Sequence, residues 1–219
     1  MMKHLLLIGK GGHYKTILSI LDESLYDKVS NKNFFLPTNR ENLNKNKKIL
    51  NSFFTKNKKE KKYIFISIGS NYIRFCIYNF LKKNVNYDYI FPNIISKFSC
   101  ISKYSSIGSG NVVMPGVVIN ANTKIGSQCI LNTSCSIDHD NQIKNFTSVA
   151  PGVNTGGKVK IDSLTHLGIG SSINHNISIG KNVVIGGGSF INKDCKSNSI
   201  YFGVPGKFIR KRKQEDNYL

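Results

Sequence analysis

The chain has 219 residues and a formal net charge of +19, from 31 Lys and Arg against 12 Asp and Glu. No stretch reaches the 18 or more apolar residues of a transmembrane helix, and Leu5–Ile8 is too short for the core of a signal peptide. Much of the charge lies in Asn39–Lys62 and Lys207–Lys213, so we interpret it as lysine-rich solvated loops. An aromatic-interleaved basic face, which would favour nucleic-acid binding, is not seen in the sequence.

The chain begins with a predicted buried strand at Lys3–Ile8, followed by the glycine turn Gly9–His13 and a helix over Tyr14–Leu21. Free backbone N–H groups converge where a strand, a glycine turn and a helix start meet, which favours binding of a phosphate or nucleotide. The full dinucleotide fingerprint is broken, because Tyr14 stands at the third glycine position. A tight turn that simply requires glycine remains the alternative.

The segment Asn39–Lys62 is dominated by Asn and Lys, so we expect a loop with at most a short strand near Ile49–Phe54. A strand is predicted at Tyr63–Ile68. After Gly69, a helix capped by Ser70 or Asn71 is expected to run to about residue 82.

Tyr87–Phe91 is predicted as a last strand, and Pro92 as the linker that closes this part of the chain. The order of elements predicts an α/β domain at residues 1–92, a small parallel sheet with a Rossmann-like βαβαβ arrangement. Ligands of such sheets bind beyond the carboxyl ends of the strands, where Gly9–His13 and Gly69–Asn71 both fall.

The second part of the chain carries a strict six-residue repeat. Sixteen of its seventeen periodic positions are Ile, Val or Leu, and only Thr155 departs. Neither a helix nor a simple strand has this period, which is typical of a parallel β-helix whose coils stack about 4.8 Å apart. We therefore expect a β-helix domain at residues 93–219 that ends in a short basic tail. The periodic positions are Ile95, Ile101, Ile107, Val113, Ile119, Ile125, Leu131, Ile137, Ile143, Val149, Thr155, Ile161, Leu167, Ile173, Ile179, Ile185 and Ile191.

Five cysteines show no CxxC spacing. Cys129, Cys135 and Cys195 fall on the small-residue position of the repeat, so we expect buried, reduced packing residues and a cytoplasmic protein. His139, His166 and His175 lack the spacing of metal ligands, and no metal is predicted.

The repeat closes with Gly203-Val204-Pro205-Gly206-Lys207 and is preceded by Gly9-Lys10-Gly11-Gly12-His13 in a small α/β domain. This combination resembles the left-handed β-helix acyltransferases. It is most similar to the family of sialic acid O-acetyltransferases and bacterial N-acetyltransferases of UDP-linked 4-amino-4,6-dideoxy sugars. The resemblance implies a homotrimer with acetyl-CoA in the groove between neighbouring chains and a nucleotide sugar on the N-terminal domain.

The resemblance also implies roles for single residues. The segment Asn132–Asp140 matches the family's catalytic segment, which gives His139 the role of general base and Asp140 that of the adjacent carboxylate. From the chemistry alone Asp138 could also serve, since a base near neutral pKa needs one carboxylate to support it. The residues expected to contact the nucleotide sugar are Gly11, Gly12, His13 and Gly69, and those expected to contact acetyl-CoA are Ser148, Ile169 and Gly187.

Ser148 stands where the family often has a second histidine. With 18 residues per coil, as in the family, His139, Gly157 and His175 stack in one column, which makes His175 a further candidate contact of the donor. The resemblance thus implies an acetyl-CoA-dependent N-acetyltransferase acting on a nucleotide-linked amino sugar for bacterial surface glycans. O-acetylation of a sialic acid or related sugar and a non-catalytic β-helix scaffold remain the alternatives.

Overall fold

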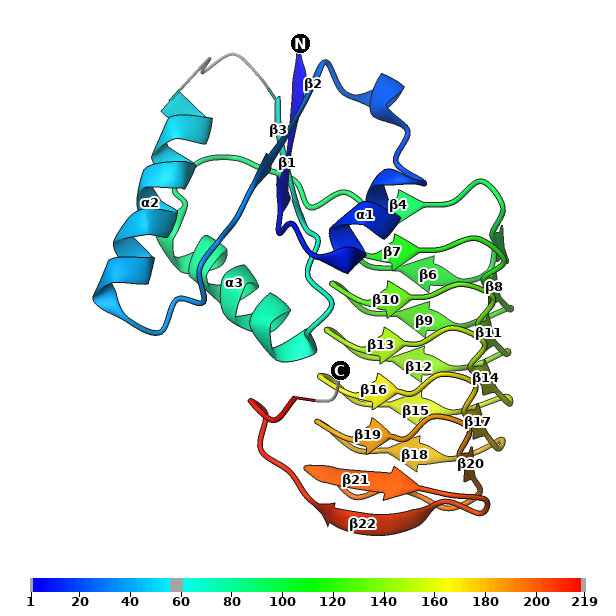
Figure 1. Cartoon of the computed structure of the whole chain (residues 1–219). Helices are drawn as coiled ribbons and strands as arrows, with labels where there is room; N and C mark the ends of the chain where they lie inside the picture. The colour runs from blue at the N-terminus through cyan, green and yellow to red at the C-terminus, as the bar shows by residue number, and fades with distance from the viewer. Residues whose placement is uncertain (1, 56–60, 218–219) are drawn as a thin grey trace. The chain divides into compact units, whose positions relative to one another are not determined.

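The computed structural model describes residues 2–55 and 61–217. The chain divides into two compact units, Met1–Pro92 and Asn93–Leu219 (Figure 1). The first is an α/β unit and the second a parallel β-helix, as the sequence predicts. No helix in the described part of the chain is long and apolar enough to cross a membrane.

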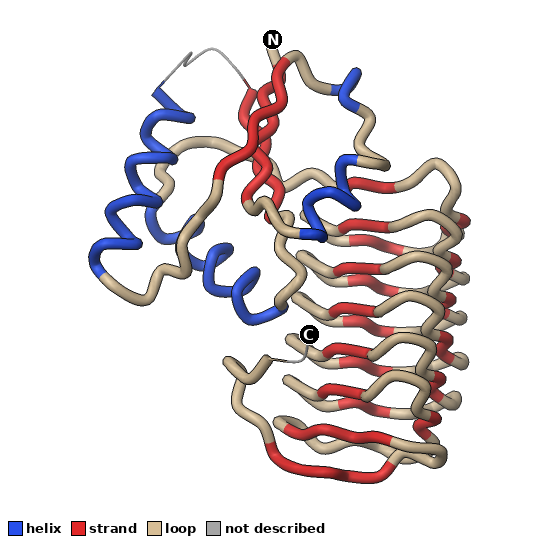
Figure 2. The backbone as a smooth tube through the Cα atoms, in the orientation of Figure 1, coloured by secondary structure: helices blue, strands red, loops and turns tan. Residues whose placement is uncertain are grey.

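The first unit is built on a parallel sheet with the strand order β2-β1-β3. Figure 2 shows the strands of this unit in red and its helices in blue. β1 (Lys3–Ile8) is central, and its residues Leu5–Ile8 are fully buried. β3 (Lys61–Ile66) matches the predicted second strand, with residues 56–60 before it outside the described residues. β2 (Lys28–Lys32) is not predicted from the sequence, because its residues Lys-Val-Ser-Asn-Lys have no apolar run. It lies at the edge of the sheet, where one neighbour supplies the hydrogen bonds and little apolar burial is needed.

The helices of this unit are α1 (Gly12–Leu18), a 3-10 turn at Glu23–Leu25, α2 (Arg40–Thr55) and α3 (Asn71–Asn84). The prediction of a loop at Asn39–Lys62 is wrong for residues 40–55. α2 buries Leu50, Phe53 and Phe54 against β1, β3 and α3, while its many Lys and Asn side chains dilute the apolar period in the sequence. The predicted cap of α3 is present, since the Ser70 hydroxyl accepts a hydrogen bond from the Ile73 N–H at 3.4 Å.

The prediction of a strand at Tyr87–Phe91 is also wrong. In the described residues this segment makes only one isolated parallel bridge, between Ile90 and Tyr63. The rings of Tyr89 and Phe91 pack against each other, and Tyr89 also contacts Phe54. Pro92 then removes the next backbone donor, so the ladder does not continue.

In the second unit the coils from Ile94 to Ile191 lay down short strands that pair in parallel with an offset of 18 residues, as between Ile119, Ile137 and Thr155. The last coil pairs with an offset of 16 residues, as between Val184 and Ile200. The strands form three sheets with the orders β22-β21-β19-β16-β13-β10-β7-β4, β20-β17-β14-β11-β8-β5 and β18-β15-β12-β9-β6. Figure 1 shows the coils stacked in chain order, from green to red. The strands are β4 (Ile94–Ile95), β5 (Cys100–Ile101), β6 (Ser106–Ile107), β7 (Val112–Val113), β8 (Val118–Ile119), β9 (Lys124–Ile125), β10 (Ile130–Leu131), β11 (Ser136–Ile137), β12 (Gln142–Ile143), β13 (Ser148–Val149), β14 (Asn154–Thr155), β15 (Lys160–Ile161), β16 (His166–Leu167), β17 (Ser172–Ile173), β18 (Ser178–Ile179), β19 (Val184–Ile185), β20 (Phe190–Ile191), β21 (Ser199–Phe202) and β22 (Lys207–Lys211).

The turns between these strands repeat one backbone conformation. From Gly110 to Gly188, every sixth residue has a positive φ between 56° and 72°. Glycine adopts this left-handed conformation readily, and Asn or Asp at modest cost. Non-glycine residues occupy it at Asn122, Gln128, Ser134, Asp140, Phe146, Lys158, Leu164, Asn176 and Asn182. The repeat therefore fixes the backbone of each turn, including the one that carries Asp140.

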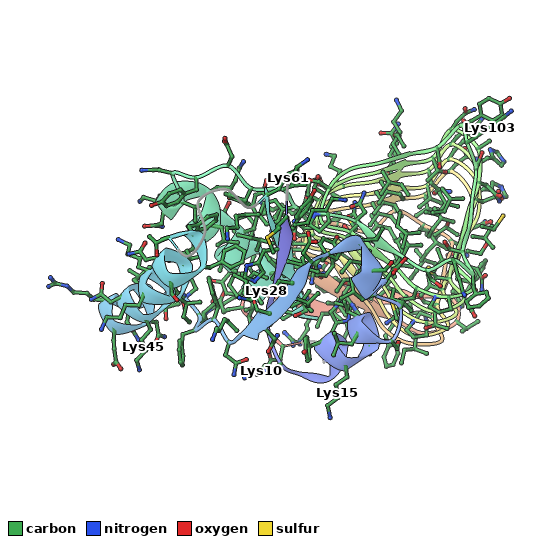
Figure 3. All side chains as sticks on the ribbon, turned by 90° about the horizontal axis from the view of Figure 1, so that it is seen from above. Lys10, Lys15, Lys28, Lys45, Lys61 and Lys103 are labelled. Atoms are coloured by element: carbon green, nitrogen blue, oxygen red, sulfur yellow. The ribbon has the colours of Figure 1, made fainter. Side chains whose placement is uncertain are left out.

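Cys129, Cys135 and Cys195 are buried in the β-helix with free thiols, as expected of packing residues. Burial raises the pKa of both Cys135 and Cys195 to about 12, so these thiols stay protonated at neutral pH. The six lysines labelled in Figure 3 (Lys10, Lys15, Lys28, Lys45, Lys61 and Lys103) are exposed, whereas Lys62 is buried.

Candidate active site

The candidate active site is built on the turn between β11 and β12. This turn brings His139 and Asp140 together: the imidazole Nδ1 lies 2.8 Å from the Asp140 carboxylate Oδ2. Because an ionised carboxylate can only accept, Nδ1 carries a proton, and in the neutral form of the ring Nε2 is the proton acceptor. Just over half of the His139 side chain surface (53%) is exposed, so a substrate can reach it.

Asp140 is kept ionised by its surroundings. The hydrogen bond from His139 lowers the pKa of its carboxyl most, followed by a hydrogen bond from the Asn122 side chain, one coil earlier. The Lys158 ammonium, one coil later, adds a smaller effect in the same direction. All three residues at positions 122, 140 and 158 share the left-handed turn conformation, so their side chains form one column along the β-helix.

Asp138 has a different task. Its Oδ1 accepts the His139 backbone N–H at 2.7 Å and the Asn120 amide at 3.1 Å. It therefore fixes the backbone of the turn, while Asp140 holds the ring. The sequence leaves both aspartates open as the supporting carboxylate, and the geometry separates them.

The sequence carries a further signal of this site at the one polar position of the apolar repeat. Thr155, the one polar residue among the periodic apolar positions, is buried, and its Oγ1 accepts the Asp138 backbone N–H at 3.2 Å. The break in the apolar repeat thus lies directly beside the turn of His139. Gly157, also not singled out as a site residue, lies against the His139 ring.

The residues expected to contact acetyl-CoA lie on other strands and turns of the β-helix than His139. Ser148 lies on β13 of the largest sheet and is nearly buried. Ile169 is 67% exposed in the turn between β16 and β17, and Gly187 lies beside it, since the Gly188 N–H donates to the Ile169 carbonyl at 2.8 Å. Within one chain, these residues and His139 belong to different faces and turns of the β-helix, so the structure does not bring them together.

In the turn after β1 of the first unit, Gly9 is the residue whose backbone conformation requires glycine. Gly9 has a φ of +117°, and an added Cβ would lie 2.9 Å from the Ser67 carbonyl oxygen. At Gly11 and Gly12 an added Cβ would meet no described atom within 4 Å. Local packing therefore explains Gly9, whereas the space in front of Gly11 and Gly12 is open.

His13 and Gly69 are linked through Arg74 of α3. The buried Arg74 guanidinium donates to the carbonyls of Ile68 at 2.8 Å and Gly69 at 2.9 Å, and so fixes the loop after β3. Burial, together with the positive charge of Arg74, lowers the pKa of His13 from 6.5 to about 4. The buried His13 Nε2 has no hydrogen-bond partner among the described residues. The ring is therefore neutral at physiological pH.

Within residues 2–55 and 61–217, no three His, Cys, Asp or Glu side chains come together as a candidate metal site. His175 is exposed at the equivalent turn two coils after His139.

These features define an α/β domain joined to a parallel β-helix that carries an exposed His-Asp pair. Residues 4–81 match the family described as the PglD N-terminal domain. The chain is also 32% identical over 90 residues to GDP-perosamine N-acetyltransferase of Escherichia coli O157:H7, which covers 41% of this chain and 40% of the relative. It is 32% identical over 114 residues to serine acetyltransferase 2 of Arabidopsis thaliana, which covers 48% of this chain and 35% of that protein. The chain thus spans less than half the length of either curated relative.

Solved structures share the fold over almost the whole chain. PerB from Caulobacter crescentus, in complex with CoA and GDP-perosamine, superposes with a TM-score of 0.80 at 22% identity, covering 94% of this chain and 97% of PerB. The acetyltransferase domain of PglB from Neisseria gonorrhoeae, in complex with acetyl coenzyme A, gives a TM-score of 0.77 at 22% identity and covers 95% of this chain and all of that domain (100%). The predicted resemblance to β-helix acyltransferases is therefore confirmed at the level of the fold and of the first domain.

Proposed function

We propose that the protein is an acetyl-CoA-dependent N-acetyltransferase that acts on a nucleotide-linked amino sugar for bacterial surface-glycan synthesis. The observation that carries the proposal is the 2.8 Å pair of His139 and Asp140 on an exposed turn of a β-helix. Relatives with acetyltransferase names, among them GDP-perosamine N-acetyltransferase, support this choice of chemistry. Acetyl-CoA is the co-substrate, and no metal takes part in the proposed step.

In the proposed reaction His139 acts as the general base. The amine nitrogen of the sugar attacks the thioester carbonyl carbon, and Nε2 accepts the proton that the nitrogen loses. The carbonyl then re-forms as the C–S bond breaks, and the departing CoA sulfur takes up a proton. Asp140 holds Nδ1–H and stabilises the imidazolium that forms in between. No covalent acyl-enzyme is required, because the amine attacks directly.

We propose that the active form is a homotrimer with a donor site shared between chains. The proposed acetyl-CoA contacts lie on other strands and turns than His139: Ser148 is buried on β13, and the exposed Ile169 lies beside Gly187. A donor bound between neighbouring chains would contact one set of residues from each chain. A closed ring of identical chains provides such heterologous contacts.

The first unit is proposed to hold the nucleotide sugar at Gly11, Gly12, His13 and Gly69. The open space at the two glycines lets a ligand approach the backbone closely. The neutral His13 ring, with Nε2 buried and unpartnered among the described residues, can hydrogen-bond a polar group without adding charge. We place the reaction in the cytoplasm, where acetyl-CoA and nucleotide sugars are made.

The experiment is an acetyl-CoA consumption assay with the purified chain against GDP-, UDP- and dTDP-linked amino sugars. Each amino sugar is paired with the corresponding sugar that has a hydroxyl in place of the amine. We expect CoA release and a product heavier by one acetyl group only with amino sugars. Acetylation of sialic acid or of the hydroxyl analogues would favour O-acetyl transfer. No turnover of any pair would contradict the proposal.

A further inference from the structure

The His139 ring lies against a residue with no side chain. An ideal Cβ built on Gly157 would be 2.6 Å from Cε1, 2.6 Å from Nε2 and 3.2 Å from Nδ1 of the His139 ring. Carbon atoms in real structures do not approach this closely, so any side chain at position 157 must displace the ring. The space that glycine leaves at position 157 is the space that the imidazole occupies.

The backbone at Gly157 does not itself require glycine. Its φ lies outside the left-handed region, unlike that of the glycines at the turn positions, such as Gly152 and Gly170. The chain around it is also fixed: Lys158 N–H donates to the His139 carbonyl, and Asn176 N–H donates to the Gly157 carbonyl, each at 3.0 Å. Moving the coils apart would break these backbone hydrogen bonds, so the His139 ring is the part expected to move when a Cβ is added.

The ring is held on its other side by Asp140, whose backbone conformation the repeat fixes at a φ of +59°. Displacing the ring from Gly157 would therefore disturb the 2.8 Å contact between Nδ1 and the carboxylate. It would also turn Nε2, the nitrogen nearest to the missing side chain, away from its present direction.

We propose that Gly157 is a positioning residue for His139: by having no side chain, it sets the tilt of the imidazole and keeps the ring on Asp140. The contact is independent of any activity, whereas its consequence for catalysis rests on the proposed function. Gly157 acts through His139 and is given no direct role toward the substrate.

Thermal melting of four full-length proteins tests the contact: native, Gly157→Ala, His139→Ala and the double variant. Alanine in place of a glycine with ordinary φ usually stabilises a protein through its unfolded state. We expect Gly157→Ala to raise the melting temperature of the His139→Ala protein but not that of the native protein, because only the latter has a ring to displace. An equal shift in both backgrounds would overturn the proposal.

Gly156→Ala is the matched control. A Cβ there would meet the His175 backbone nitrogen at 2.8 Å and make no close contact with His139. This variant should therefore lower the melting temperature by the same amount with and without His139. If Gly156→Ala shows the same dependence on His139 as Gly157→Ala, the specific contact with the ring is refuted.

Kinetics test the consequence for the active site. We expect Gly157→Ala to lower kcat by roughly 10- to 100-fold, as for a misplacement of a catalytic group by about 1 Å, with both KM values changed less than about twofold. Asp140→Asn should lower kcat in the native background and change it less than about twofold in the Gly157→Ala background, because the ring has already left the carboxylate. Multiplicative effects of the two substitutions would overturn the positioning role.

The two sets of data separate the two proposals. If melting shows the coupling but His139→Ala retains acetyl transfer, the proposed base is wrong and Gly157 positions a ring without that role. If the coupling in melting is absent, the Gly157 proposal fails whatever the activity of the protein.

Discussion

The lowered pKa of His13 predicts a specific dependence of stability on pH. The ring has a pKa of about 4 in the folded protein, against 6.5 for an exposed histidine, because it is buried and close to Arg74. Between these values the unfolded chain binds a proton that the folded chain does not. Stability therefore falls as the pH drops below 6.5, and this loss levels off below about pH 4.

The size of the effect follows from the same two values. Each pKa unit is worth about 1.36 kcal/mol, so the drop from 6.5 to about 4 sets a ceiling of about 3.4 kcal/mol at low pH and of about 2 kcal/mol between pH 7 and pH 5. Because the ring is not fully buried, we expect about half of this ceiling. For a chain of this size that is a fall of a few degrees in melting temperature.

The assay compares thermal melting of the native protein and His13→Gln at pH 7, 6 and 5. Glutamine keeps a polar side chain but cannot take up a proton. The native protein should lose more stability on acidification than the variant, because all other titratable groups are the same in the two proteins. Equal losses in the two proteins would show that His13 titrates normally and that the account of its surroundings is wrong.

Three further predictions concern the proposed sites. Gly12→Val should raise the KM for the nucleotide sugar far more than the KM for acetyl-CoA, since an added Cβ meets no described atom and only a bound ligand would sense it; equal effects on both KM values would contradict the site. Asp140→Asn should lower kcat with little change in melting. Asp138→Ala should mainly lower the melting temperature, because it removes the oxygen that accepts the His139 backbone N–H. Steady-state kinetics and calorimetry check this pair, and a reversed pattern would contradict the separate roles. Light scattering should give about 73.5 kDa, three times 24.5 kDa, and a fully active monomer would exclude a donor site shared between chains.

The β-helix could be predicted closely because the same apolar pattern recurs in every coil. The six-residue period requires an apolar side chain at every coil, and each of these positions forms part of a strand in the structure or pairs in register with the next coil. The three-stranded sheet was predicted less well. β2 has no apolar run, because an edge strand can be polar, and Lys and Asn on the exposed face of α2 conceal the apolar stripe of Leu50, Phe53 and Phe54.

The candidate site was predicted only as far as single residues allow. The segment around His139 identified the imidazole and two neighbouring aspartates. The separate roles of the two aspartates depend on the turn conformation at Asp140 and on the hydrogen bond from the His139 backbone N–H to the Asp138 carboxylate. The role of Gly157 could not be read from the chain, because glycine is common at such turns and its contact with the ring spans one whole coil. Thr155 could have been recognised from the sequence, because a polar residue among apolar periodic positions indicates a local need for a hydrogen-bond acceptor.

The most direct test of the central claim is the rate of acetyl transfer by His139→Ala, with His175→Ala, two coils further along the same column, as the matched control. We expect His139→Ala to lower kcat by roughly 10²–10⁴, the usual contribution of a positioned general base, while acetyl-CoA binding measured by calorimetry changes little. His175→Ala should stay within a few-fold of the native rate. If His139→Ala keeps more than about a third of the native rate, a change in barrier below about 1 kcal/mol, His139 is not the base and the account is wrong.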